Sequence, residues 1–141
     1  MSLVEGTITI NAASKVILQS LEDVAFAPEW IPGLDKVWAI RGRGAGCTYR
    51  WQYRIGKLRF RGSTEIIESA QERFVMRTQG GIPSVWAWTM IDAENSVILD
   101  LQIDYMLPAT VLGNIAANIL RRQGRKEAQL ALMNLKKRLE K

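Results

Sequence analysis

Aromatic side chains recur at alternate positions through the middle of the chain, which is the spacing that places side chains on one face of a β-strand. The aromatic residues on this expected inner face, with Met76 and Met90 between them, are Tyr49, Trp51, Tyr53, Phe60, Phe74, Trp86, Trp88 and Tyr105. Rings and methionines form an adaptable apolar wall, and phenol and indole groups add hydrogen-bonding groups to it. The pattern predicts either a filled core or the wall of a pocket for an apolar or aromatic compound.

Acid–base chemistry on a bound compound would need a carboxylate beside these tyrosines, or a tyrosine that stabilises an enolate. The expected inner positions offer hydroxyl groups and no carboxylate, because Glu65, Asp100 and Asp104 alternate onto the outer face. The chain also contains no histidine, which excludes Ser-His-Asp and Cys-His nucleophile systems and nearly all zinc sites. The sequence therefore identifies no catalytic residue, metal site or cofactor, and it leaves open whether the protein is an enzyme.

The same alternation predicts the elements that hold this wall. Strands are expected over residues 4–10, 36–43, 47–55, 58–66, 72–79, 83–91 and 97–107. Apolar residues occupy both faces of the strands at 72–79 and 83–91, so the pattern leaves their inner faces open. Ser14 is expected to cap a helix that extends to about residue 25, and residues 28–31 are expected to form a short second helix.

The chain ends in a predicted long helix over residues 107–141 whose apolar face changes direction halfway along. Its first stripe contains Leu112, Ile115 and Ile119. The second stripe, over residues 128–139, is rotated by about a third of a turn. One helix with two apolar faces must cover two surfaces of a bent sheet, and we expect it to leave unfilled space beneath. Gly113 and Gly124 are expected to weaken the helix, so that it moves to admit a ligand.

Consecutive hairpins require an antiparallel sheet. One solvent-exposed face of this sheet explains why apolar and polar residues alternate along its strands. The order of elements predicts an α+β fold in which a curved, seven-stranded antiparallel sheet wraps around the long C-terminal helix, with two short helices after the first strand. No linker, repeat or low-complexity segment interrupts the chain, so we expect residues 1–141 to form a single domain.

Three local motifs accompany this order of elements: AASKV at residues 12–16, PEWIPG at residues 28–33 and YMLP at residues 105–108. With them, essentially the whole chain resembles the polyketide cyclase/dehydrase group of the START-like (SRPBCC) superfamily. The resemblance implies a helix-grip fold, in which the sheet grips the C-terminal helix around a deep and largely apolar cavity. Members include aromatic polyketide cyclases and carriers of lipids or coenzyme Q, so the fold alone does not choose between catalysis and carriage.

We predict that a hydrophobic small molecule of lipid, quinone or polyketide type binds between the sheet and the C-terminal helix, oriented by one or two tyrosines. The predicted ligand-binding residues are Trp30, Tyr49, Trp51, Tyr53, Phe60, Met76, Trp86, Trp88, Leu101, Tyr105, Leu112, Ile115 and Ile119. Trp30 is expected either to plug the space between the small helices and the sheet or, as the resemblance implies, to gate the cavity mouth. The alternative is a polyketide cyclase/dehydrase-type enzyme that uses the pocket tyrosines and a carboxylate.

Positive charge is concentrated between residues 36 and 64, which include no acidic residue. The basic residues of this segment are Lys36, Arg41, Arg43, Arg50, Arg54, Lys57, Arg59 and Arg61. The four arginines from Arg50 to Arg61 are expected to form a ladder on the outer face of the sheet. This ladder is either an ordinary solvated surface or, as a second alternative function, an adaptor surface for an anionic membrane or a protein partner. No aromatic signature of RNA binding accompanies it, which disfavours nucleic acid. The outer strands leave the formation of a homo-oligomer open.

The single cysteine, Cys47, cannot form an internal disulfide, which favours a reducing compartment. No apolar run approaches the roughly 18 residues that a membrane-spanning helix needs, and no leader peptide is expected at the N-terminus. We therefore expect a cytoplasmic protein.

Overall fold

The structure is a computed structural model of the chain, and it describes all residues except 1, 56, 81, 107–113 and 141. The side chains of residues 2, 55 and 114–120 also lie outside the description. The elements in chain order are β1 (Ser2–Ile10), α1 (Ser14–Glu22), the 3-10 helix η1 (Val24–Glu29), β2 (Leu34–Arg41), β3 (Thr48–Ile55), β4 (Leu58–Ala70), β5 (Arg73–Gln79), β6 (Ser84–Ala93), β7 (Ser96–Tyr105) and α2 (Asn114–Leu139). Within these ranges, no helix is long and apolar enough to cross a membrane.

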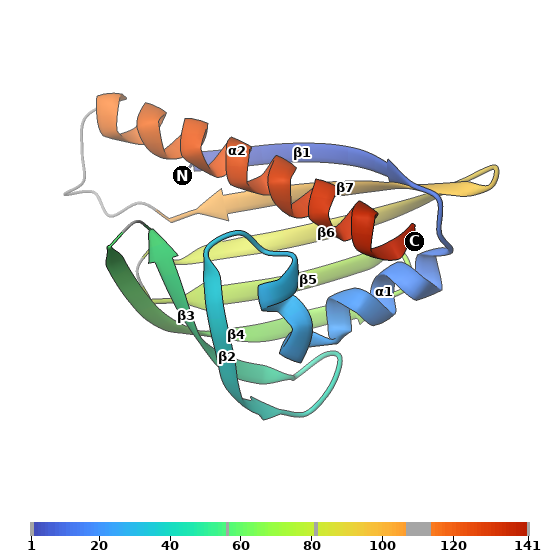
Figure 1. Cartoon of the computed structure of the whole chain (residues 1–141), viewed down its shortest axis with the longest axis horizontal. Coiled ribbons are helices and arrows are strands. Elements are labelled where there is room, and N and C mark those ends of the chain that lie inside the picture. Colours follow the sequence, from blue (N-terminus) through green and yellow to red (C-terminus); the bar gives the residue numbers. More distant parts are fainter. Residues whose placement is uncertain (1, 56, 81, 107–113, 141) are drawn as a thin grey trace.

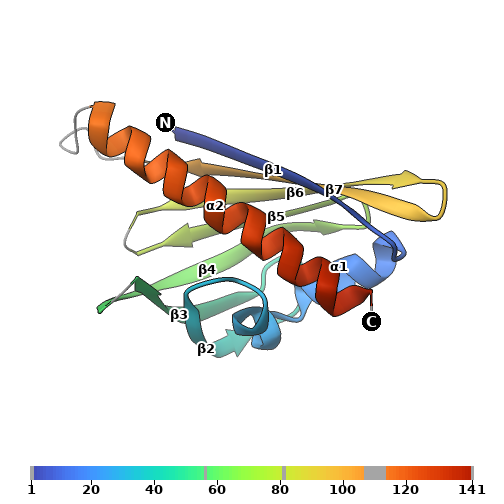
Figure 2. The same cartoon turned by 45° about the horizontal axis from the view of Figure 1, so that its top comes forward.

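The seven strands form one antiparallel sheet in the order β1-β7-β6-β5-β4-β3-β2. Strands that follow one another in the chain are neighbours from β2 to β7, and β1 pairs with β7. The sheet is strongly curved, and α2 lies along its concave face (Figures 1 and 2). The prediction of an α+β fold with a seven-stranded antiparallel sheet, short helices after the first strand and a long C-terminal helix is confirmed.

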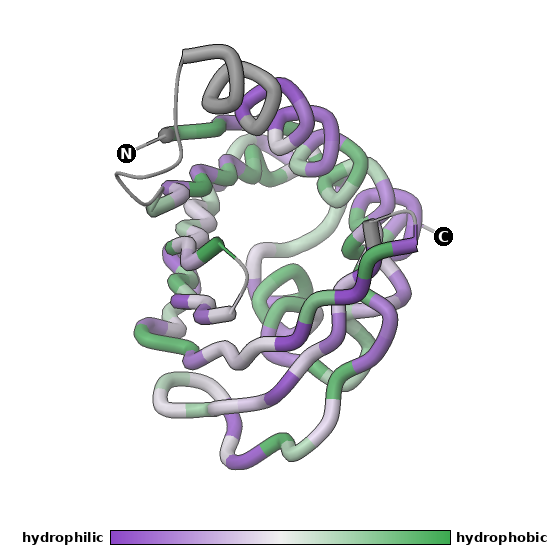
Figure 3. Tube along the Cα trace, turned by 90° about the vertical axis from the view of Figure 1, so that its left-hand side faces the viewer, coloured by the Kyte–Doolittle hydropathy of each residue, from purple (hydrophilic) through white to green (hydrophobic). Residues whose placement is uncertain are grey.

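Viewed from the end at which α2 begins, the sheet curls from β1 beside the helix round to β2 at the far edge (Figure 3). The structure also decides the orientation of the two strands that the sequence left open. Phe74 and Met76 of β5 and Trp88 and Met90 of β6 are buried, and the register sets Phe74 opposite Trp88. These side chains therefore belong to the inner face, together with Trp86, which lies opposite Met76.

The second apolar stripe of α2 packs onto the sheet as predicted. Its members Ala128, Ala131, Leu132 and Leu135 are at most 1% exposed. Gly6 of β1 permits this close approach, because a Cβ atom there would lie 3.0 Å from Leu132 Cδ1. The predicted start of the long helix at residue 107 lies outside the described residues.

Two predictions about the first helix are wrong. Ser14 does not cap α1, because Ala13 holds the N-cap position without a side-chain hydrogen bond. The buried Ser14 hydroxyl instead accepts a hydrogen bond from Gln71 Nε2 at 3.1 Å, so a tertiary contact replaces the local cap. The helix also ends earlier than predicted. Asp23, with φ −84° and ψ 68°, leaves the helical conformation, and η1 begins directly after it instead of at residue 28.

Candidate functional site

The predicted ligand-binding residues that the structure describes meet around the concave face of the sheet, where they form an aromatic inner wall. The buried ones are Trp30, Tyr49, Met76, Trp88 and Leu101, and the partly exposed ones are Trp51, Tyr53, Phe60, Trp86 and Tyr105. Trp88 lies among these rings. Its ring centroid is 5.6 Å from that of Trp30, in an edge-to-face arrangement, and 6.3 Å from that of Trp86. Leu112 and the side chains of Ile115 and Ile119 lie outside the described residues.

The inner wall is more exposed toward one end of the sheet. Tyr53 and Phe60 are cross-strand neighbours near the hairpin between β3 and β4. Trp86 lies near the start of β6 and Tyr105 at the end of β7. These strand ends lie at the end of the molecule where α2 begins (Figure 1). Aromatic surface that is only partly covered inside a curved sheet offers contact area to an apolar ligand.

Two indole groups of the wall already have a hydrogen-bond partner. The Trp51 indole donates to Thr64 Oγ1 at 3.0 Å, and the Trp86 indole donates to Ser84 Oγ at 2.9 Å. The Trp88 indole nitrogen, in contrast, is buried and has no partner in the described part of the chain. A buried donor without an acceptor costs about 1–3 kcal/mol, so this N–H group would gain from an acceptor atom supplied by a ligand.

A carboxylate reaches this wall from the helix. The Tyr53 phenol lies near the carboxylate of Glu127 on α2, and burial together with this carboxylate raises the pKa of Tyr53 well above its ordinary value. Burial and then the negative charge of Glu127 raise the pKa of Tyr105 to about 12. We call Tyr53, Tyr105 and Glu127 the tyrosine–glutamate cluster. Both phenols are protonated at neutral pH, so they act as hydrogen-bond donors.

The residues predicted from the sequence did not include Glu127, which is partly exposed. The signal that would have found it is helical spacing. Glu127 lies three residues after Gly124 and four before Ala131, and both of these residues are buried against the sheet. The surrounding lysines and arginines hid this relationship because they suggested a face made only of charges.

Each tyrosine of the cluster packs against a glycine. A Cβ atom on Gly124 would lie 3.1 Å from both Cε2 and the hydroxyl oxygen of Tyr105. A Cβ atom on Gly33, whose φ is +81°, would lie 2.8 Å from Cζ of Tyr53. Gly124 is therefore a point of close contact between α2 and β7, a role that the sequence interpretation, which took it as a weak point of the helix, did not foresee.

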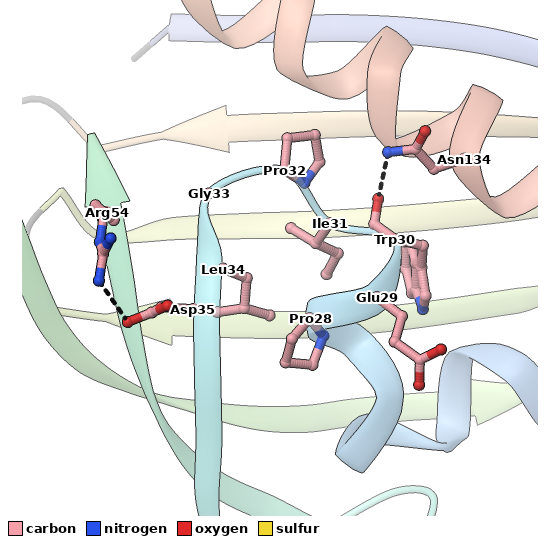
Figure 4. Close-up of a pocket in the computed structure, with 10 residues that line it drawn as sticks. All are labelled: Pro28, Glu29, Trp30, Ile31, Pro32, Gly33, Leu34, Asp35, Arg54 and Asn134. Carbon is pink, nitrogen blue, oxygen red and sulfur yellow. Dashed lines mark hydrogen bonds and ion pairs between the residues drawn. The ribbon is translucent and has the colours of Figure 1, made fainter. Parts of the chain in front are cut away.

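An open pocket of about 330 Å³ borders the segment that links η1 to β2. It is lined by Pro28, Glu29, Trp30, Ile31, Pro32, Gly33, Leu34, Asp35, Arg54 and Asn134 (Figure 4). Asn134 of α2 donates to the Trp30 carbonyl oxygen at 3.1 Å, and Arg54 of β3 pairs with Asp35 at 3.3 Å. The segment is thus fastened to the helix and to β3, while the Trp30 ring is 4% exposed and contacts Trp88.

In a comparison with known proteins, one family matches nearly the whole length of the chain. The family described as polyketide cyclase / dehydrase and lipid transport matches residues 1–140. A search of curated proteins found no significant match.

Several solved structures share the fold. A protein from Thermus thermophilus is 16% identical with a TM-score of 0.84, covering 97% of this chain and 96% of its own. A START superfamily protein from Mycobacterium smegmatis is 16% identical with a TM-score of 0.82, covering 99% and 98%. The Zhui aromatase/cyclase from a Streptomyces species is 14% identical with a TM-score of 0.73, covering 98% and 93%. At these identities the likeness establishes the fold alone.

Proposed function

Because the chain belongs to the polyketide cyclase/dehydrase and lipid transport family, we propose that it binds a hydrophobic small molecule of lipid, quinone or polyketide type between the inner wall and α2. The observation that carries the proposal is the partly exposed aromatic wall that ends in the tyrosine–glutamate cluster. This arrangement favours a compound with an aromatic or fused-ring body and an oxygen atom at one end. The body lies against Trp86 and Phe60, and the oxygen lies at the cluster.

The physical basis is burial of apolar surface combined with a few directed polar contacts. Removing ligand surface from water contributes about 25 cal/mol per Å² before the ordering costs are subtracted. Tyr105 supplies the orientation, because its hydroxyl makes no hydrogen bond within the described residues and remains protonated at neutral pH. The Glu127 carboxylate is available as an acceptor for Tyr53, so Tyr105 is the better donor to a carbonyl oxygen of the ligand.

The first test is binding of 2-acetylnaphthalene, with naphthalene as the matched probe that lacks oxygen. Quenching of tryptophan fluorescence reports occupancy, since Trp86 lies in the wall. We expect saturable binding of the ketone and weaker binding of the hydrocarbon. In the variant Tyr105→Phe, which keeps the ring and removes the hydroxyl, the preference for the ketone should shrink. Absence of saturable binding, together with no compound extracted from protein purified from its own host, would overturn the proposal.

A second candidate function, that of a cyclase/dehydrase-type enzyme, is favoured by the position of the Glu127 carboxylate near Tyr53 and Tyr105. In that reaction class Glu127 would accept a proton from the carbon next to a ligand carbonyl, and a tyrosine hydroxyl would donate to the enolate oxygen that forms. Polyketide cyclisation and dehydration both begin with such a proton transfer.

The test of this candidate is deuterium exchange into the methyl group of 2-acetylnaphthalene in heavy water, measured by mass spectrometry. An enzyme accelerates the exchange, and Glu127→Gln abolishes the acceleration while the ketone still binds. Binding without any accelerated exchange leaves carriage as the function. The two candidates are thus separated with one compound.

A further inference from the structure

The outer face of the sheet carries a second pocket that the proposed function does not use. It spans about 330 Å³ and is lined by Trp38, Arg50, Arg61, Gly62, Ser63, Gln79 and Gly80. Strand register builds it, because Trp38 lies opposite Arg50, Arg50 opposite Ser63, and Ser63 opposite Gln79. An indole, a guanidinium, a hydroxyl and an amide therefore stand in one row across β2, β3, β4 and β5.

The positive charge in this outer pocket is not neutralised by neighbouring acids. Glu65 pairs with Arg77 at 3.3 Å, and Asp35 pairs with Arg54 at 3.3 Å. Among the described residues, neither Arg50 nor Arg61 forms an ion pair with a carboxylate. Two guanidinium groups beside one hollow, without a bound carboxylate, favour an anionic ligand.

The guanidinium group of Arg61 is also held in place, by the side-chain amide of Gln52. The Gln52 side chain is only 4% exposed. Its Oε1 accepts a hydrogen bond from Arg61 Nε at 3.3 Å, and its Nε2 donates to Asp35 at 2.8 Å. A buried amide thus fixes the inner nitrogen of the guanidinium and leaves the two terminal nitrogens for a ligand. Such a planar fork matches the oxygen atoms of a phosphate.

The pocket also has an aromatic side. Trp38 is partly buried, and the Lys36 ammonium lies 5.3 Å from its ring centroid, which adds a third positive charge beside the indole. An indole next to guanidinium groups provides a stacking surface for a ring that carries an anionic group. The lining includes no aliphatic side chain, which a surface inserted into a membrane would need. This composition favours a soluble ligand over a lipid headgroup.

We propose that the outer pocket binds a small aromatic phosphate monoester, with the chemistry of a nucleoside monophosphate. Arg50 and Arg61 hold the phosphate, and the ring lies against Trp38. The site is on the opposite face of the sheet from the inner wall, so it does not depend on the proposed function there.

The test is calorimetric titration of the full chain with adenosine monophosphate, with adenosine and inorganic phosphate as partial probes. We expect saturable binding of the nucleotide, and binding of each partial probe weaker by about tenfold or more, because two charge-assisted hydrogen bonds or one stacking contact is lost. Arg50→Gln and Arg61→Gln should each weaken nucleotide binding by about tenfold. Arg77→Gln, on the same face but paired with Glu65, is the matched control and should change it less than about twofold.

A separate arm uses vesicles of phosphatidylcholine with phosphatidic acid, whose headgroup is also a phosphate monoester. Nucleotide binding that depends on Arg50 and Arg61, with circular dichroism showing folded variants, supports the proposal. The proposal is overturned by the absence of saturable nucleotide binding, by equal effects of Arg50→Gln and Arg77→Gln, or by vesicle binding without nucleotide binding. The last result would assign the face to a membrane surface instead.

Discussion

The phenol of Tyr53 on β3 lies near the carboxylate of Glu127 on α2, and burial together with this carboxylate raises the pKa of the phenol. β3 lies next to the edge of the sheet opposite β1, while α2 packs on β1. This pair therefore brings together distant parts of the fold across the inner face. It also introduces negative charge beside a wall that is otherwise apolar and aromatic.

The first prediction concerns this charge. Replacing Glu127 with glutamine removes the carboxylate that raises the pKa of Tyr53 and of Tyr105, so both pKa values should fall. Absorbance of tyrosinate during an alkaline titration measures this shift, since the chain has only three tyrosines. Glu140→Gln on the same helix is the control. Glu140 is bound by the Asn11 backbone and by Lys136, and its replacement should leave the tyrosine titration unchanged.

Stability at alkaline pH provides the second prediction. Burial raises the pKa of Tyr49 and of Tyr105 from 10.0 to about 12. Below about pH 10 both the folded and the unfolded chain keep these protons, so these two tyrosines give no pH dependence of stability there. As the pH rises from 10 toward 12, the unfolded chain releases protons that the folded chain retains, and the free energy of unfolding falls. Urea unfolding at a series of pH values should show this loss.

Phenylalanine variants provide the check on this pH dependence. In Tyr49→Phe and in Tyr105→Phe one titrating group is absent, so stability should fall less steeply above about pH 10. An unchanged slope in both variants would assign the alkaline loss to other groups, such as Tyr53, whose pKa is also raised.

The third prediction concerns Gly124, where two physical effects oppose each other. Alanine is favoured over glycine inside a helix by about 1 kcal/mol. A Cβ atom here would, however, lie 3.1 Å from Tyr105 and 3.2 Å from Val4 Cγ2, and overpacking typically costs about 1–3 kcal/mol. We expect Gly124→Ala to destabilise the protein by about 1 kcal/mol in urea unfolding. In the background of Val4→Ala, which removes one of the crowded atoms, Gly124→Ala should cost less than it does in the unmodified chain, and a stabilised Gly124→Ala protein would refute the close contact.

Much of the inner wall follows from the sequence because the alternation of strand residues is local. A period of two decides which face the residues of β3, of β7 and of β4 up to Ile66 occupy, and Tyr49, Trp51 and Tyr53 accordingly lie on one face. For β5 and β6 the pattern was ambiguous, because apolar residues occupy both faces of these strands. Val75, for example, is buried although it lies between the inward Phe74 and Met76. Only the pairing with neighbouring strands resolves such cases.

The contribution of the helix was harder to predict because it depends on how α2 crosses the sheet. Glu127 neighbours the buried Ala128, and a small rotation of the helix decides whether its carboxylate faces solvent or Tyr53. Ser14 shows the same limit. A serine at a helix start is a good cap by local rules, but the distant Gln71 occupies its hydroxyl. Sequence patterns describe local preference, and contacts across the fold override it.

The fourth prediction tests how Tyr53 is positioned, and the chain offers a matched pair of glycines. Gly33 and Gly46 have φ values of +81° and +90°, so alanine is strained at both positions by about 1–2 kcal/mol. A Cβ atom at Gly46 has nothing within 4 Å, whereas one at Gly33 would lie 2.8 Å from the Tyr53 ring. Gly33→Ala should therefore destabilise the protein more than Gly46→Ala, and the difference reports the crowding of the Tyr53 ring and of the Arg54 carbonyl oxygen, which would lie 3.0 Å from the new Cβ atom. Gly33→Ala alone should also move the Tyr53 phenol out of its buried position near Glu127 and lower the pKa of Tyr53, which tyrosinate absorbance measures. Equal stability losses and identical titrations in the two variants would mean that Gly33 does not position Tyr53.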